Sequence, residues 1–321
     1  MILKDQTTMS LVDVTKMFSM LQAKEEEQGN EESQLLFQAV SNDDHKLLAE
    51  LLSQEKYKKF INRRSGWGIP GTPLRLAACE GHLKCLEVLL SFGAEVDSLD
   101  VKAQTPLFIA VRGGHLECVQ ALLAAGADPN GSIHNGCSPL LNAARQGNVE
   151  IIKELLNHDA EINVRQKLAG WARNPAICSG PLYLSAIYRQ LECFKILLVY
   201  GADPDYNCID EEVLARLNHP KTVLDSCLKH GCGTEYIKLL IDFGANVYLP
   251  TFVVDHTVKC EAMDLVNHER AHPKMLMSQC RLVIRKSLLQ AKELQSIDRL
   301  DIPAILKDYL KHETVVQISA V

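Results

Sequence analysis

A 33-residue internal repeat is the feature that most constrains how this 321-residue chain can fold. Three tripeptides recur at that interval: Thr72-Pro73-Leu74, Thr105-Pro106-Leu107 and Ser138-Pro139-Leu140. A glycine stands seven residues after each leucine, and a pair of leucines begins fifteen residues after it. No unit of this size can bury its apolar face alone, so neighbouring units must stack to form a core. The sequence therefore predicts an array of stacked repeats.

Each repeat carries the start and stop signals of two helices. The Thr or Ser caps the first helix through its hydroxyl group, and the proline occupies the first helical position. The glycine ends this helix in a left-handed turn, and the leucine pair lies on the buried face of the second helix. These motifs resemble the ankyrin repeat, and the resemblance implies an all-α ankyrin-repeat solenoid.

The same template extends in both directions from these three units. Leu182 and Leu224 head two further repeats, and a degenerate first repeat begins near Leu36, with Asp43 in place of the turn glycine. We therefore predict about six repeats over residues 31–250. Residues 251–269 form a cap or a linker, unless residues 246–270 hold a remnant seventh repeat.

The first thirty residues stand apart from the array. Apolar residues recur there at helical spacing and predict a short amphipathic helix, and the acidic, Gln-rich stretch after it predicts a flexible linker. This segment of residues 1–30 either packs on the first repeat or binds a partner.

Two insertions interrupt the regular spacing, near residues 164–180 and 205–221. The interval between anchoring leucines lengthens there from 33 to 42 residues. Insertions in repeat arrays tend to fall on the binding face, and these contain Trp171, Arg173 and Tyr206, residue types that often anchor interfaces. We expect these residues to bind a target protein; the alternative is that the aromatic side chains fold back and cover the edges of the array.

Arg112 and Arg145 lie just before the turns of their repeats. In ankyrin arrays this position lines the concave side, so the resemblance implies a basic strip there. Such a strip would suit an acidic segment of a target. The alternative is an ordinary row of solvated charges.

The last fifty residues carry a second pattern. Leu276, Cys280 and Ile284 are spaced four residues apart, which places them on one stripe of a helix. Pro303 then precedes another short stripe, where it would end one element and open the next. This arrangement resembles the SOCS box, here over residues 270–312 and followed by a tail of residues 313–321. Together with the repeats, it resembles the ankyrin repeat and SOCS box family.

The resemblance implies a partner for each stripe. In that family the first stripe binds elongin C, which assigns this contact to Leu276, Cys280 and Ile284. The second stripe sets the preference for cullin-5, and the matching residues are Leu300, Ile302, Pro303, Leu306, Tyr309 and Leu310. The chain departs from the family motif at Met275, where a small residue or proline is usual, and at Asp301, which replaces a proline.

These resemblances imply the substrate-recognition subunit of an elongin B/C–cullin-5 E3 ubiquitin ligase. The ankyrin repeats would bind an unidentified target protein, and a RING-box protein on the cullin would recruit the conjugating enzyme. Because the chemistry belongs to other subunits, we expect no enzymatic activity, no catalytic or metal-binding residues and no cofactor. The alternative is a ligase-independent ankyrin scaffold whose tail helix only caps the array.

Composition excludes several other classes of protein. A net charge of −6 gives no reason to expect nucleic acid as a partner. No apolar run approaches the roughly 18 residues that span a bilayer, and the first residues lack the apolar core of a signal peptide. The eleven cysteines include no Cys-x-x-Cys pair. We expect no contact with membranes and a location in the cytoplasm, with the nucleus as the other compartment open to the chain.

Overall fold

The computed structural model describes residues 31–64, 71–135, 137–164, 180–205, 222–248, 261–272, 274–291 and 294–312. All regular elements in these ranges are helices, which confirms the predicted fold class. The chain divides into two compact units, residues 1–95 and 96–321. This boundary falls inside the predicted array of residues 31–250. Stability in stacked repeats is local, so an array of this kind can divide between repeats.

The first unit holds two helical repeats. The degenerate first repeat contains α2 (Glu31–Ser41) and α3 (His45–Leu52), followed by the short α4 (Glu55–Lys58); the second contains α5 (Pro73–Glu80) and α6 (Leu83–Ser91). Helix α2 packs on α5, and α3 packs on α6. Asp43 adopts the left-handed conformation, with φ 54°, that glycine adopts in other repeats. The Nδ1 atom of His82 lies 2.8 Å from the carbonyl oxygen of Val40, a hydrogen bond that ties the two repeats together.

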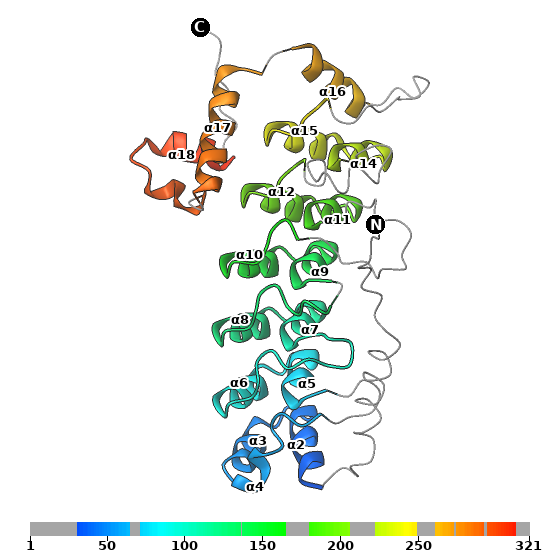
Figure 1. Ribbon diagram of the computed structural model, residues 1–321, viewed down its shortest axis with the longest axis vertical. Helices are drawn as coiled ribbons and strands as arrows, with labels where there is room; N and C mark the ends of the chain where they lie inside the picture. Colours follow the sequence, from blue (N-terminus) through cyan, green and yellow to red (C-terminus); the bar gives the residue numbers. More distant parts are fainter. Residues whose placement is uncertain are drawn as a thin grey trace, which may run out of the picture. The chain divides into compact units, whose positions relative to one another are not determined.

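The second unit begins with four helical pairs. They are α7 (Pro106–Gly113) and α8 (Leu116–Ala124), α9 (Pro139–Gln146) and α10 (Val149–Asn157), α11 (Pro181–Ile187) and α12 (Leu191–Val199), and α14 (Val223–Lys229) and α15 (Thr234–Asp242). The first helices of the pairs lie in one row and the second helices in another (Figure 1).

Local sequence signals explain the ends of these helices. The hydroxyl oxygens of Thr105, Ser138 and Thr222 accept hydrogen bonds from backbone N–H groups three residues later, at 3.2, 3.3 and 2.9 Å. Gly114 and Gly147 end their helices with φ 75° and 83°, a conformation that costs glycine nothing. The predicted caps and turns are therefore confirmed.

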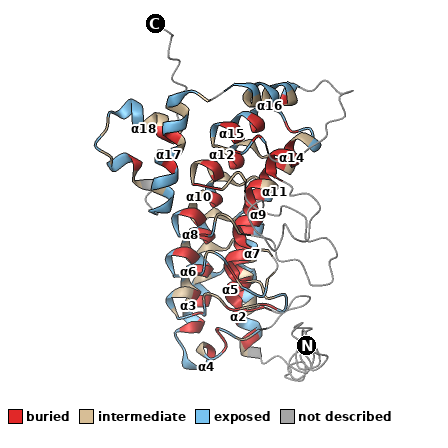
Figure 2. Ribbon diagram, turned by 45° about the horizontal axis from the view of Figure 1, so that its top comes forward, coloured by how far each residue is buried: buried red, intermediate tan, exposed pale blue. Residues whose placement is uncertain are grey.

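The core of the second unit lies between the two rows of helices (Figure 2). Its leucines recur at equivalent positions and are at most 1% exposed: Leu107, Leu122, Leu140, Leu155, Leu197 and Leu240. Cys118 and Cys193 are buried free thiols in the same core.

The array is followed by α16 (Glu261–Ala271), α17 (Leu276–Gln290), the 3₁₀ helix η1 (Leu294–Arg299) and α18 (Ala304–Lys311). Helix α16 packs on α15, and the Arg270 Nε–H donates a 2.7 Å hydrogen bond to the carbonyl oxygen of Val247. The sequence left open whether residues 246–270 form a cap, a linker or a seventh repeat. The structure describes one helix in this region, α16.

Several predicted features lie outside the described residues. These are the N-terminal helix within residues 1–30, the insertion residues Trp171, Arg173 and Tyr206, and the tail of residues 313–321. Among the helices that the structure does describe, none has the length and apolar composition needed to cross a membrane.

Candidate docking site on the C-terminal helices

Helix α17 exposes an apolar ridge along one side. The ridge consists of Leu276, Cys280, Val283 and Ile284; Leu276 is 75% exposed, Val283 65% and Ile284 41%. An ordinary capping helix would bury this stripe against the array, and here it faces solvent. Val283 belongs to the ridge although the sequence prediction left it out, and its position seven residues after Leu276 was the available signal.

The opposite side of α17 is buried and carries two arginines. Arg281 and Arg285 are each only 7% exposed. The Arg285 guanidinium donates hydrogen bonds to the carbonyl oxygens of Val199 at 2.7 Å and Leu198 at 3.2 Å, at the end of α12. It donates another, at 2.7 Å, to the carbonyl oxygen of Leu310 near the end of α18. Its positive charge therefore lies at the negative ends of two helices.

Aromatic rings and a carboxylate complete the surroundings of these arginines. Arg285 lies 5.0 Å from the centre of the Phe243 ring, and Arg281 lies 4.6 Å from the centre of the Tyr309 ring. Arg281 also lies 3.7 Å from a carboxylate oxygen of Asp242. Burial lowers the pKa of Arg285 to about 10, with repulsion by Arg281 contributing, so this side chain stays charged at neutral pH.

Two glycines of the array allow α17 to approach closely. A Cβ atom on Gly244 would lie 3.1 Å from a methyl carbon of Leu282, and one on Gly201 would lie 2.6 Å from a methyl carbon of Leu289. Leu282 and Leu289 are seven residues apart, about 10.5 Å along the helix axis. That step is close to the spacing of roughly 8–10 Å between packed helices, so each leucine meets a different repeat.

The second predicted stripe is exposed in part. Pro303 lies immediately before α18 and is exposed, and Leu306 is 40% exposed. Leu300, Ile302 and Tyr309 are half-buried. Ile305, which the sequence prediction did not include, is 59% exposed beside them.

Leu310 requires a correction. It was predicted to contact cullin-5, yet its side chain is only 4% exposed and its carbonyl oxygen is bonded to Arg285. Since α18 packs against α17 and η1, the last apolar residue of the stripe turns inward. Leu310 therefore supports the module from inside and does not offer a side chain to a partner.

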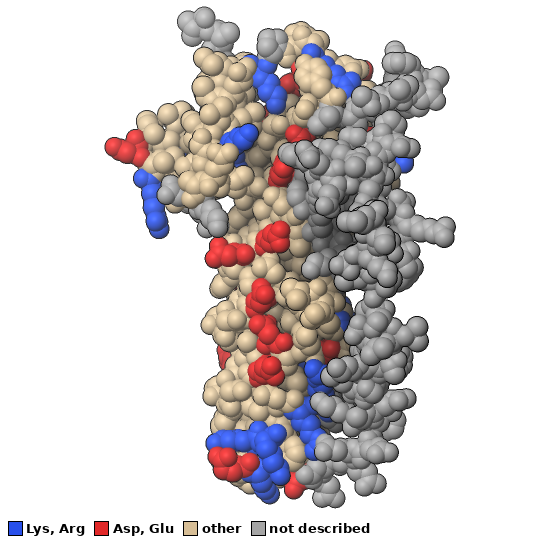
Figure 3. All heavy atoms as spheres, viewed as in Figure 1, with Lys and Arg blue, Asp and Glu red and all other residues tan. Residues whose placement is uncertain are grey.

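The predicted basic residues of the array are exposed, but their surroundings carry both signs of charge. Arg145 donates a 2.6 Å hydrogen bond to the Asn142 side chain, and Arg112 donates one of 3.4 Å to Gln104. Arg112 lines a shallow hollow of about 460 Å³ together with Glu150. Acidic residues also occupy the first turn of each second helix of the second unit, at Glu117, Glu150, Glu192 and Glu235. Figure 3 shows acidic side chains gathered over α8 and α10, so the expected strip is not uniformly basic.

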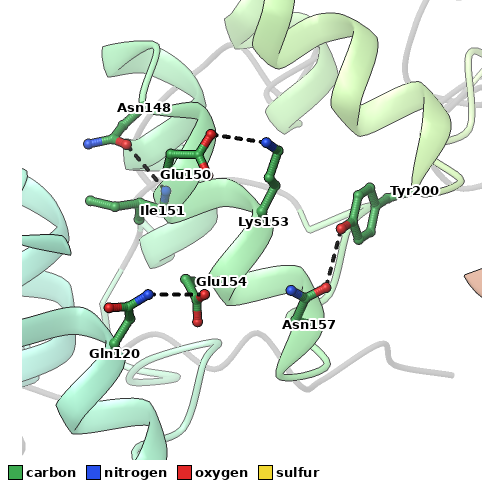
Figure 4. Close-up of polar contacts among 8 residues, drawn as sticks. All are labelled: Gln120, Asn148, Glu150, Ile151, Lys153, Glu154, Asn157 and Tyr200. Carbon is green, nitrogen blue, oxygen red and sulfur yellow. Dashed lines mark hydrogen bonds and ion pairs between the residues drawn. The ribbon is translucent and has the colours of Figure 1, made fainter. Parts of the chain in front are cut away.

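Polar contacts join the second helices of the array to one another (Figure 4). Gln120 on α8 donates a 3.2 Å hydrogen bond to Glu154 on α10, and the Tyr200 hydroxyl, at the end of α12, donates one of 3.2 Å to Asn157. Lys153 forms a 3.0 Å ion pair with Glu150. Glu150 and Glu154 thus have partners within the array.

No group of three or more His, Cys, Asp or Glu side chains that could hold a metal ion occurs in the described ranges. His268 and His272 stack with their ring centres 4.3 Å apart, and the Nδ1 atom of His272 lies 2.9 Å from the carbonyl oxygen of His268. These contacts are local, since His268 lies in the last turn of α16 and His272 directly follows its end.

Comparison with known proteins finds the same two parts. The ankyrin repeat family matches residues 36–133, 77–166 and 131–210, and the SOCS box family matches residues 272–311. The chain is 62% identical to ankyrin repeat and SOCS box protein 12 of Mus musculus over 95% of this chain and all of the relative. It is 64% identical to the Homo sapiens protein of the same name, with the same coverage.

A more distant relative and a solved structure point to the same family. Ankyrin repeat and SOCS box protein 1 of Mus musculus is 46% identical over 84% of this chain and 85% of the relative. The crystal structure of the human ASB11 ankyrin repeat domain superposes with a TM-score of 0.52 at 27% identity, covering 78% of this chain and 96% of that one. The chain therefore belongs to the ankyrin repeat and SOCS box family, which implies the role of a SOCS-box adaptor for a ubiquitin ligase.

Proposed function

We propose that the chain is the target-binding subunit of a ubiquitin ligase built on elongin B, elongin C and cullin-5. The observation that carries this proposal is the solvent-exposed apolar ridge on α17. Exposed apolar side chains that lie together mark sites where another protein binds. Because the opposite face of α17 is bonded to the array, the ridge is left for a partner to cover.

Elongin C is the partner that we propose for the ridge. An apolar helix face of this kind docks into a groove and places its anchors at spacings of three and four residues. Leu276 and Ile284 would enter pockets, with Cys280 between them. Burial of one leucine contributes about 1.5–3 kcal/mol, and each 1.4 kcal/mol corresponds to about tenfold in affinity.

The test is a double substitution, Leu276→Ala with Cys280→Ala, in the full chain. We expect its affinity for purified elongin B/C, measured by biolayer interferometry, to fall by tens to hundreds of fold. Lys286→Ala is the control, since Lys286 is exposed on the same helix outside the ridge and should leave affinity unchanged. Failure of the wild-type chain to bind elongin B/C would refute the proposal, as would equal binding by the double variant.

Cullin-5 is proposed to contact the segment that joins η1 to α18 and the first turn of α18. Pro303, Ile305 and Leu306 offer the exposed apolar groups there, and Ile302 is half-buried beside them. Asp301 adds a charge where the family motif has a proline, which weakens the match to that motif.

The ankyrin array is proposed to bind the target. Arg112 and Arg145 remain our candidates for contacts with acidic groups of the target, and Trp171, Arg173 and Tyr206 are candidates within the insertions. In this assembly the chain supplies proximity and orientation, which raise the effective concentration of target lysines near the conjugating enzyme. The buried free thiols fit the cytoplasmic location that we propose.

A further inference from the structure

The contacts of Arg285 join three helices that are far apart in the sequence. Its guanidinium binds the carboxyl ends of α12 and α18, 86 and 25 residues away along the chain, while its own backbone belongs to α17. Its side chain is 7% exposed, and the ring of Phe243 from the end of α15 lies beneath it. One side chain thus connects the last two repeats of the array to the SOCS box.

Only arginine has the shape for this set of contacts. The guanidinium is a planar fork with five N–H donors, and it binds three carbonyl oxygens here in fixed directions. A lysine would keep the charge, but its single ammonium group could not span both helix ends in the same geometry.

Arg285 lies where its hydrogen bonds can hold α17 against rotation about its own axis. Arg285 follows Leu276 by nine residues, and nine steps of 100° place it on the side of the helix opposite the ridge. The leucines that meet Gly201 and Gly244 hold α17 close to the array, but apolar contact has no preferred direction. Hydrogen bonds are directional, so those of Arg285 resist rotation of α17 about its own axis.

We propose that Arg285 is a positioning residue that fixes the direction in which the apolar ridge faces relative to the ankyrin repeats of the second unit. With elongin on the ridge and a target on the array, Arg285 would set where target lysines lie relative to the rest of the ligase. That consequence rests on the proposed function, whereas the geometric claim concerns this chain alone.

The experiment measures the distance between the array and α17 in the full chain. Donor and acceptor dyes are attached through noncanonical amino acids at Glu117 on α8 and Gln290 on α17, both exposed, and single-molecule energy transfer is recorded. The variants are Arg285→Met and Arg285→Lys, with Lys286→Met as the matched control. Each is measured alone and with saturating elongin B/C, and its affinity for elongin B/C is determined separately.

For Arg285→Met we expect the distance distribution to broaden at least about twofold, because the directional bonds are lost. Affinity for elongin B/C should stay within about threefold of wild type, because the ridge lies on the other side of the helix. Arg285→Lys should broaden the distribution to an intermediate degree, and Lys286→Met should match wild type.

An unchanged distribution in Arg285→Met would overturn the proposal, and so would equal broadening in Lys286→Met. If Arg285→Met unfolds the SOCS box and loses elongin, Arg285→Lys decides: broadening supports the proposal and a wild-type distribution refutes it. A wild-type chain that does not bind elongin B/C would defeat the proposed function, but the distances in the free chain would still test Arg285.

Discussion

Asn142 is the buried residue that departs most from the pattern of the repeats. The equivalent positions of neighbouring repeats hold Ile109 and Leu184. Asn142 is 0% exposed, and its Oδ1 atom accepts a hydrogen bond from Arg145, while its Nδ2 atom has no partner among the described residues. A buried donor without a partner costs about 1–3 kcal/mol. The array thus gives up stability at a position that orients an exposed arginine.

We predict that Asn142→Leu raises the free energy of unfolding by about 1–2 kcal/mol, because it removes the unpaired donor and restores an apolar core position. Urea denaturation monitored by circular dichroism would measure the change. The reverse substitution at the equivalent position, Ile109→Asn, should lower the same free energy. A less stable Asn142→Leu chain would mean that the bond to Arg145 outweighs the cost of the buried amide.

At the scale of elements, two glycines allow the contribution of the contact between α17 and the array to stability to be separated from the effect of backbone strain. Gly126 and Gly201 close equivalent repeats with similar φ values of 88° and 97°. A Cβ atom on Gly126 would meet nothing within 4 Å, whereas one on Gly201 would meet Leu289. The two positions therefore share the backbone strain of a substitution but differ in contact with α17.

We predict that Gly201→Ala is more destabilising than Gly126→Ala. Both changes place alanine at positive φ, at a cost of about 1–2 kcal/mol, and Gly201→Ala adds the cost of displacing the Leu289 side chain. Hydrogen exchange should show faster exchange in α17 for Gly201→Ala alone. Equal losses in the two variants would show that α17 does not rest on Gly201.

The end of α18 should make the SOCS box sensitive to acid. The His312 ring stacks on Phe243 with centres 3.7 Å apart, and burial lowers the pKa of His312 to about 3, with Arg281, Arg285 and Lys195 adding repulsion. The folded state thus keeps His312 neutral, while the unfolded chain binds a proton near pH 6.5. The stabilising contribution is complete above that pH and is lost progressively as the pH falls toward 3.

We predict that the SOCS box loses stability between about pH 7 and pH 5 and that His312→Asn reduces this loss. Asparagine does not titrate, and it tolerates the left-handed conformation of His312, whose φ is 62°. Burial raises the pKa of Asp242, so uptake of a proton by that carboxyl as the pH falls has the opposite, stabilising sign. Hydrogen exchange of α18 at pH 7 and pH 5 would measure how its opening free energy changes with pH. The same change in the wild-type chain and in His312→Asn would contradict the prediction.

At the scale of the whole molecule, the local signals predicted far more than the contacts between distant segments. The Thr-Pro caps, the turn glycines and Asp43 act within a few residues, so the helices of each repeat followed from the sequence. The stripe of Leu276, Cys280 and Ile284 was also readable as helical spacing. The buried arginines were not, because each looks like a solvated charge in the sequence. Only the fold places Asp242 and the Tyr309 ring beside Arg281, and the carbonyl groups of α12 and α18 beside Arg285. Leu310 was misassigned for the same reason.

We predict that co-expression with elongin B/C raises the soluble yield of the full chain, since free protein exposes the ridge to water. The measurement is the soluble fraction on size-exclusion chromatography with and without elongin B/C. A ridge variant, Leu276→Ser with Ile284→Ser, should be more soluble alone and should gain little from elongin B/C. Equal yields of the wild-type chain under both conditions would contradict the prediction.

The surface on which α17 rests includes glycine turns and helix carbonyl ends, and most repeats of this array have such parts; Asp159 replaces the glycine in the repeat of α9 and α10. The seven-residue step between Leu282 and Leu289 matches the spacing of one repeat, so α17 rests on two adjacent repeats, those closed by Gly201 and Gly244. An array with more or fewer repeats ahead of these two would offer α17 the same seat, while the distance from the SOCS box to the far end of the array would change.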